Sequence, residues 1–140
     1  YYTHYKLEND RYVEDTISAL DAVKTSKKEE LKAKRNELAN ASKEFTTNLL
    51  NTFPVDLNIN NRSTMHQAYD NHVNASLSTS LTTNWKMADN NYYEITYDEI
   101  LELGQLMGVY INDLFQHESS KLTEIEACVN DTTCINNITW

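Results

Sequence analysis

The sequence predicts an all-α fold, a four-helix antiparallel bundle that forms a single domain over residues 1–140. Two observations favour this class. The chain has only two glycines and one proline, the residue types that make most tight turns in β-sandwiches and barrels. Apolar residues also recur at three- and four-residue steps through most of the chain, as on one face of a helix. Because the connections between these segments are short, neighbouring helices are expected to run antiparallel.

The first two predicted helices cover about 5–25 and 27–52. Ser26 followed by Glu29 is a capping-box pattern, which predicts a new helix start near residue 27. Pro54 then ends the second helix. The break between the two helices contains no glycine or proline. One continuous helix, giving three long helices in all, is therefore the alternative.

The third predicted helix covers about 64–89, where apolar residues recur every four positions. Thr96 followed by Glu99 is a second capping-box pattern, and it predicts the start of a fourth helix over about 97–128. No segment is repeated at a fixed period that the sequence alone reveals.

Gly104 and Gly108 lie four positions apart, and therefore on one side of the fourth predicted helix. Glycines in this arrangement favour the close approach of another backbone. A hinge or kink in the helix is the alternative.

The formal net charge of −9 argues against a nucleic-acid partner, because such partners need basic patches. No apolar run approaches the roughly 20 residues that span a bilayer, so no membrane span is expected. The sequence contains neither a nucleophile-elbow motif nor a glycine-rich phosphate loop. We therefore expect no catalytic residues, no enzymatic activity and no cofactor.

His66 and Asp70 could hold two positions of a divalent metal ion, since residues at i and i+4 project from the same side of a helix. Two ligands do not make a metal site. We therefore expect surface polar residues here and no bound metal.

The compartment is predicted from the asparagines and cysteines. The closing segment CVNDTTCINNITW holds both cysteines, Cys128 and Cys134, and we expect them to form a local disulfide that pins the tail 128–140. Pairing with another chain is the alternative. The chain also contains five Asn-x-Ser/Thr glycosylation sequons, at Asn40, Asn61, Asn74, Asn130 and Asn137. Together these features favour a secreted, extracellular glycoprotein over an intracellular protein with an asparagine-rich composition.

Tyrosine is unusually frequent, with nine residues gathered mainly in YYTHY and NNYYEITY. Tyrosine side chains offer large contact areas at low entropic cost, and they are enriched in binding surfaces. We therefore take Tyr92, Tyr93 and Tyr97 as candidate partner-binding residues. The alternative is that these rings cover the end of the bundle with their hydroxyls in water.

The segment YINDLFQHESSKLTEIEACVND, residues 110–131, has an aromatic and aliphatic helical pattern that closes on Cys128. It resembles the terminal helix of insect secreted proteins with a TsetseEP-type domain. The resemblance implies a helical extracellular protein from an insect.

Three functions fit these expectations. The first is a secreted binding protein that engages, or inhibits, an extracellular partner protein. The second is a carrier of a small apolar ligand in the bundle core. The third is a helical cytokine-like ligand, which the size, helices, glycans and disulfide would suit.

Overall fold

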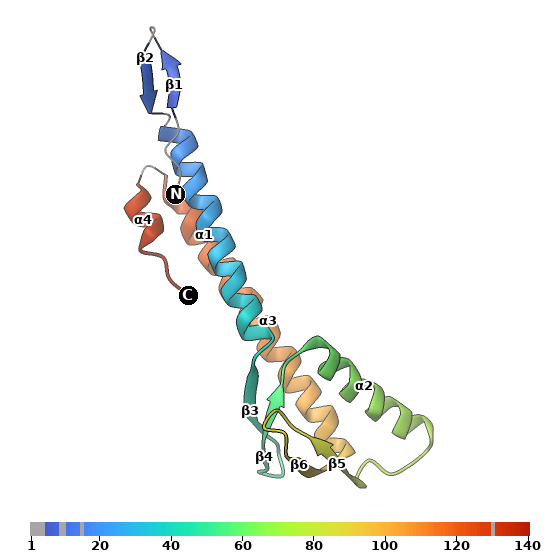
Figure 1. The fold of residues 1–140 in the computed structure, drawn as a ribbon. Helices are drawn as coiled ribbons and strands as arrows, with labels where there is room; N and C mark the ends of the chain where they lie inside the picture. Colours follow the sequence, from blue (N-terminus) through green and yellow to red (C-terminus); the bar gives the residue numbers. More distant parts are fainter. Residues whose placement is uncertain (1–4, 9–10, 15, 130) are drawn as a thin grey trace. The chain divides into compact units, whose positions relative to one another are not determined.

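The computed structural model describes four stretches of the chain, residues 5–8, 11–14, 16–129 and 131–140, with side chains from Ala19 onward. Along these stretches, pairs of strands are each followed by a helix, and a short helix comes last (Figure 1). In chain order they are β1 (Tyr5–Glu8), β2 (Arg11–Glu14), α1 (Thr16–Ala39), β3 (Ser42–Thr46), β4 (Thr52–Asp56), α2 (Ile59–Asn74), β5 (Thr82–Lys86), β6 (Tyr92–Thr96), α3 (Tyr97–Ala127) and α4 (Thr132–Asn136).

The predicted all-α bundle is wrong, because the fold mixes helices with three two-stranded antiparallel sheets. The shortage of glycine misled the prediction. Three other residues adopt the left-handed backbone conformation that glycine usually supplies in turns: Leu50 with φ 64°, Ser76 with φ 59° and Asn90 with φ 66°. Turns in this chain therefore form without glycine.

Three of the four predicted helices are also wrong in their bounds. The predicted helix 5–25 begins with strands, and α1 continues without interruption through the break expected near residue 26. No glycine or proline lies there to stop it, so the continuous-helix alternative describes α1 better, although α1 ends at Ala39.

The predicted helix 64–89 begins inside α2, which ends at Asn74, and its second half covers β5 instead of continuing as a helix. Its apolar residues recur every four positions, and four is also a multiple of the two-residue period of a strand. The fourth predicted helix, 97–128, lies close to α3, which covers Tyr97–Ala127.

The chain divides into two compact units. We call residues 1–36 with 115–140 the helical unit, and residues 37–114 the hairpin unit. The single domain expected over residues 1–140 stays a prediction.

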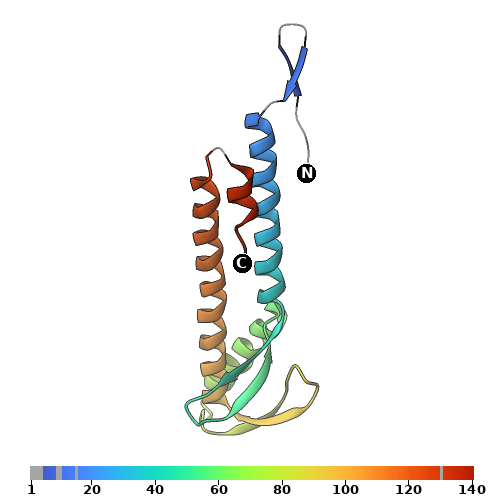
Figure 2. The ribbon, with the colours of Figure 1, turned by 90° about the vertical axis from the view of Figure 1, so that its left-hand side faces the viewer.

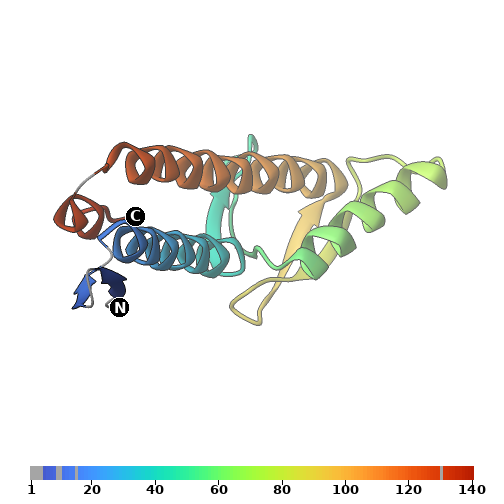
Figure 3. The ribbon, with the colours of Figure 1, turned by 90° about the horizontal axis from the view of Figure 1, so that it is seen from above.

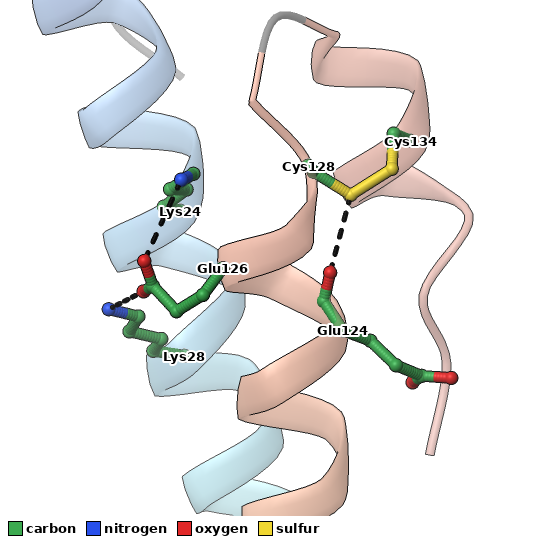
Figure 4. A network of polar contacts seen from close by, with 6 residues as sticks. All are labelled: Lys24, Lys28, Glu124, Glu126, Cys128 and Cys134. Carbon is green, nitrogen blue, oxygen red and sulfur yellow. Dashed lines mark hydrogen bonds and ion pairs between the residues drawn. A yellow bond between two sulfur atoms is a disulfide. The ribbon is translucent and has the colours of Figure 1, made fainter.

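In the helical unit, α1 and α3 run antiparallel, and α4 lies beside them (Figures 2 and 3). The Arg35 guanidinium donates to Glu118 Oε1 over 2.8 Å and lies 4.5 Å from the centre of the Phe115 ring. Nearer the other end, the Glu126 carboxylate lies 3.7 Å from Lys24 Nζ and 2.7 Å from Lys28 Nζ (Figure 4). These side chains connect α1 to α3 in a single antiparallel register.

The predicted disulfide between Cys128 and Cys134 is present and joins the end of α3 to α4 (Figure 4). Closing so short a loop stabilises the folded chain by about 2 kcal/mol on the chain-entropy estimate. It holds α4 so that Ile135, fully buried, joins the apolar cluster of this unit. The other buried members of that cluster are Val23, Leu31, Ile125, Cys128 and Ile138.

Within the stretches that the structure describes, the order strand, strand, helix occurs three times. The second and third copies are offset by 40 positions, because β3 begins at Ser42 and β5 at Thr82, while β4 begins at Thr52 and β6 at Tyr92. The sequence alone predicts no repeat, because the residue types at equivalent positions mostly differ. The strand positions and the turn geometry are what repeat.

The hairpin unit has its core where the two hairpins meet α2 and α3. Phe53 of β4 and Tyr93 of β6 occupy equivalent positions at the 40-residue offset, and their rings contact edge to face at 5.8 Å. Ala88 N also donates to Pro54 O over 2.9 Å, which joins the second hairpin to the first. The buried core residues are Phe45, Phe53, Val55, Leu57, Met65, Met87, Ile95, Ile100, Leu103 and Met107.

The capping box predicted at the start of α3 is present. Glu99 N donates to Thr96 Oγ1 over 3.0 Å, and Thr96 N donates back to Glu99 Oε1 over 3.3 Å. Two backbone donors that the helix itself cannot satisfy are therefore paired.

The same carboxylate also holds the turn of the first hairpin. Thr47 Oγ1 donates to Glu99 Oε2 over 2.6 Å, and Asn51 Nδ2 donates to it over 3.1 Å. Glu99 is only 3% exposed and Thr47 only 2% exposed, so these bonds are largely shielded from water. One buried carboxylate thus joins the β3–β4 turn to the first turn of α3.

The pKa of Glu99 lies below its ordinary value of 4.5. Burial by itself raises this pKa, but the hydrogen bonds from Thr47, Asn51 and Thr96 favour the charged form and outweigh burial. A folded-state pKa below the unfolded value adds stability above the unfolded pKa. That stability is lost as pH falls through the folded pKa.

We expect Glu99→Gln to lower the free energy of unfolding at neutral pH by roughly 1–3 kcal/mol, because an amide has one acceptor oxygen where the carboxylate has two. The difference from the wild type should shrink as pH falls below the ordinary carboxyl pKa, where the unfolded chain takes up a proton at Glu99, and it should vanish below the lowered pKa of the folded state. Urea unfolding at neutral and acidic pH measures both effects. Glu94→Gln, on the exposed side of β6, is the matched control. Equal losses in the two variants would contradict the role given to Glu99.

Candidate functional site

The three candidate tyrosines do not share one surface role. Tyr92 is 70% exposed on β6. Tyr93 is half-buried with its ring against Phe53, and Tyr97 is half-buried with its ring stacked on His72 at 3.5 Å between ring centres. Their predicted role in partner binding stays a prediction, and only Tyr92 offers most of its surface to a partner.

The hydroxyl of Tyr93 is engaged within the chain. It donates to Asp89 Oδ2 over 2.6 Å, and the same carboxylate accepts from Asn91 N over 3.0 Å. The bond to Asp89 raises the pKa of Tyr93 and lowers the pKa of Asp89, because it favours the neutral phenol and the charged carboxylate. Tyr93 therefore braces the turn between β5 and β6.

The sequon asparagines differ in accessibility. Asn61, in the first turn of α2, is half-buried, and its Nδ2 donates to Asp56 O over 2.7 Å. A glycan on that nitrogen would have to replace the bond. Asn130 lies outside the described residues. The remaining three are exposed: Asn40, Asn74 and Asn137.

His66 and Asp70 do lie together on α2, with His66 Nε2 3.1 Å from Asp70 Oδ2. Among the residues that the structure describes, no three His, Cys, Asp or Glu side chains are grouped so as to hold a metal ion. The two side chains are an exposed polar pair one turn apart on the helix.

The turn that closes the β3–β4 hairpin is the first candidate site, and we call residues 47–51 the leucine tip (Figure 1). Thr47 N donates to Asn51 O over 2.9 Å, and Leu50 N donates to Thr47 O over 2.8 Å. Leu50 completes the turn with φ 64°. Its side chain is 83% exposed, and that of the preceding Leu49 is 61% exposed.

The second hairpin closes with the same turn 40 positions later. Met87 N donates to Asn91 O over 2.9 Å, and Asn90 N donates to Met87 O over 3.0 Å. Asn90 has φ 66° at the position of Leu50. Asparagine tolerates this conformation, whereas a branched apolar residue there is strained by about 1–2 kcal/mol. The first hairpin therefore has a strained leucine at the position where the second hairpin has an unstrained asparagine.

The leucine tip is also held firmly to α3. Besides the bonds from Thr47 and Asn51 to Glu99, the backbone N of Asn48 donates to Glu102 Oε1 over 2.7 Å. Three hydrogen bonds to two carboxylates fix the turn. The two leucines are thus displayed in a preorganised conformation.

A pocket between α2 and α3 is the second candidate site, and its volume is about 270 Å³. An added Cβ at Gly104 or Gly108 would have no described neighbour within 4 Å, so the predicted close approach of another backbone is wrong. At Gly104 the missing side chain instead leaves open space at the pocket wall. The lining residues are Arg62, Met65, His66, Tyr69, Ile100, Leu101, Gly104 and Gln105.

Neither candidate site was found by the sequence analysis. A comparison of the two hairpins at their 40-residue offset would have placed Leu50 opposite Asn90, which is a usable signal for the leucine tip. The pocket joins residues of two helices separated by a hairpin, and no local pattern in the sequence marks it.

The fold and its sites define a protein of repeated strand–strand–helix units with a disulfide-linked tail. Residues 22–138 match a domain family described as domain of unknown function (DUF4376). Because this match covers most of the chain, the protein belongs to the DUF4376 family. No curated protein and no solved structure matches the chain.

One further finding bears on the predicted absence of a membrane span. Among the described helices, none is both long enough and apolar enough to cross a membrane. The resemblance of residues 110–131 to proteins with a TsetseEP-type domain stays a prediction.

We expect Leu50→Asn to raise the free energy of unfolding by about 1 kcal/mol, because asparagine relieves the strain at a positive φ. The reciprocal change Asn90→Leu should lower it by a similar amount, because it brings the same strain into the second hairpin. Urea unfolding midpoints of the two variants and the wild type measure both changes. A Leu50→Asn variant less stable than the wild type would show that the leucine is not strained.

Proposed function

We propose that this chain is a non-enzymatic binding protein that engages a partner protein through the leucine tip. The observation that carries the proposal is Leu50, an 83% exposed apolar residue held at φ 64°. Both its exposure and its backbone conformation cost free energy in the isolated chain. Strain of this kind is concentrated at binding and catalytic sites.

The chemistry of the leucine tip suits a partner with an apolar pocket. Leu49 and Leu50 are adjacent, and the turn that presents them is already fixed by the bonds to Glu99 and Glu102. Little further ordering is then needed on binding, which favours affinity. Tyr92, exposed on β6, is a second contact candidate.

The two other functions suggested by the sequence have less support. The carrier alternative placed a small apolar ligand in the core of a four-helix bundle, and in the hairpin unit that core is replaced by two hairpins packed with α2 and α3. The cytokine-like alternative depended on a four-helix bundle, and it loses its basis with that fold. Binding of a partner protein remains the best supported function.

We also propose that the protein is a secreted glycoprotein that works in the extracellular space. The disulfide between Cys128 and Cys134 supports an oxidising compartment. The exposed sequon asparagines Asn40, Asn74 and Asn137 are accessible to a glycan.

To test the leucine tip, we would use the wild type and Leu50→Asn as baits in affinity capture from the fluid of the natural source. All baits, the control included, are produced without N-linked glycans, because each substitution creates a new Asn-x-Thr sequon. We expect a protein that the wild type retains to be lost from the Leu50→Asn bait, while the fold is preserved or stabilised. Reconstitution of a one-to-one complex from purified components would then give the affinity of each bait.

Leu77→Asn is the matched control, because it removes a leucine that is 51% exposed in the connection between α2 and β5. It should retain the partner. A partner held equally by wild type and Leu50→Asn would contradict binding through the leucine tip.

The glycoprotein proposal predicts added mass at Asn40, Asn74 and Asn137, with the lowest occupancy at Asn61, whose amide donates to Asp56 O. Peptide mass spectrometry of the natively expressed protein, before and after glycosidase treatment, measures each site. Five unmodified asparagines would refute the proposal.

A further inference from the structure

The pocket between α2 and α3 has an apolar interior and a polar rim. Met65 and Ile100 are each 1% exposed, and Leu101 and Tyr69 are half-buried beside them. Its volume of about 270 Å³ is larger than a cavity of about 150 Å³ that accepts benzene. One aromatic ring with a short polar substituent would therefore fill it.

Gly104 makes this space available. A glycine inside a helix costs about 1 kcal/mol relative to alanine. The fold does not require it, because an added Cβ would meet no described atom within 4 Å. A larger side chain at this position would occupy the pocket, so the glycine is explained better by a ligand than by packing.

The charge at the rim indicates what the ligand carries. The hairpin unit contains ten Asp and Glu residues but only three Lys and Arg, of which Arg62 alone lines the pocket. Arg62 Nε donates to Leu57 O over 3.0 Å, which orients the guanidinium. Within the described part of the chain, no carboxylate forms an ion pair with Arg62.

His66, also at the rim, already has an acidic partner, because its Nε2 lies 3.1 Å from Asp70 Oδ2. Arg62 is therefore the group left to receive an anion. A guanidinium binds a carboxylate through two parallel hydrogen bonds. The acidic surroundings disfavour a doubly charged group such as a phosphate, which leaves a single carboxylate.

We propose that this pocket binds a small aromatic or short aliphatic monocarboxylate, with the carboxylate on Arg62 and the apolar end against Met65, Ile100 and Leu101. Gly104 provides the space for the apolar end. This site is separate from the leucine tip, and it would give the protein a small-molecule ligand as well as a protein partner.

The test is a titration of the full ¹⁵N-labelled chain with phenylacetate, followed by amide chemical shifts. Phenylacetamide, its neutral analogue, and acetate, which lacks the ring, are titrated in parallel. We expect phenylacetate to shift the amides of residues 62–69 and 100–105 saturably. Phenylacetamide should bind at least tenfold more weakly, and acetate should give no saturable shift.

Three variants separate the contributions. Gly104→Leu should abolish phenylacetate binding, while the matched control Gly108→Leu, one turn further along α3 and outside the pocket lining, should keep it. Both should unfold at higher temperature than the wild type, because both replace a helical glycine. Arg62→Gln should reduce phenylacetate affinity to that of phenylacetamide.

Three results would overturn the proposal. They are the absence of saturable shifts with phenylacetate, equal affinity of the wild type for phenylacetate and phenylacetamide, and retained binding in Gly104→Leu. None of them bears on the leucine tip, whose partner is measured separately.

Discussion

The Glu99 carboxylate joins two parts of the hairpin unit that are far apart in sequence. Through one oxygen it completes the cap of α3 with Thr96, and through the other it accepts from Thr47 and Asn51 in the first hairpin. A buried carboxylate without donors would be strongly destabilising, so the turn and the helix start must be placed together for either to be stable. The conformation of the leucine tip follows from this requirement.

The two hairpins of this unit use one backbone design for different purposes. In the second hairpin, Asn90 adopts the positive φ of the turn without the strain of a branched apolar residue, and Asp89 accepts a hydrogen bond from Tyr93. The polar side chains of this turn are therefore paired within the hairpin. In the first hairpin, hydrogen bonds to α3 anchor the turn, while the side chains of Leu49 and Leu50 are exposed to water. The two hairpins thus show that the fold needs the turn conformation but does not need an exposed leucine in it.

Sequence reasoning succeeded where the signal was local. The cap of α3 was predicted because Thr96 and Glu99 are three positions apart, and the disulfide because Cys128 and Cys134 are close in the chain. β5 was missed because a four-residue apolar spacing fits both a helix and a strand. The rarity of glycine also concealed turns made by Leu50 and Asn90.

The candidate sites depend on placement that no local pattern records. The pocket needs Arg62 and Gly104 from different helices, and the leucine tip is recognisable only once the backbone angle of Leu50 is known. A leucine at an exposed position is ordinary by itself. A leucine that is exposed, strained and firmly anchored at once is not.

The division of the chain also sets an order of assembly. The hairpin unit is one continuous segment, residues 37–114, whereas the helical unit needs residues from both sides of that segment. During synthesis from the N-terminus, every residue of the hairpin unit is available before the second half of the helical unit has been made. The loop that separates the two halves of the helical unit is shortened once the hairpin unit has folded, which lowers the entropy cost of bringing α1 and α3 together. Folding of the segment that carries both candidate sites therefore favours closure of the rest of the chain.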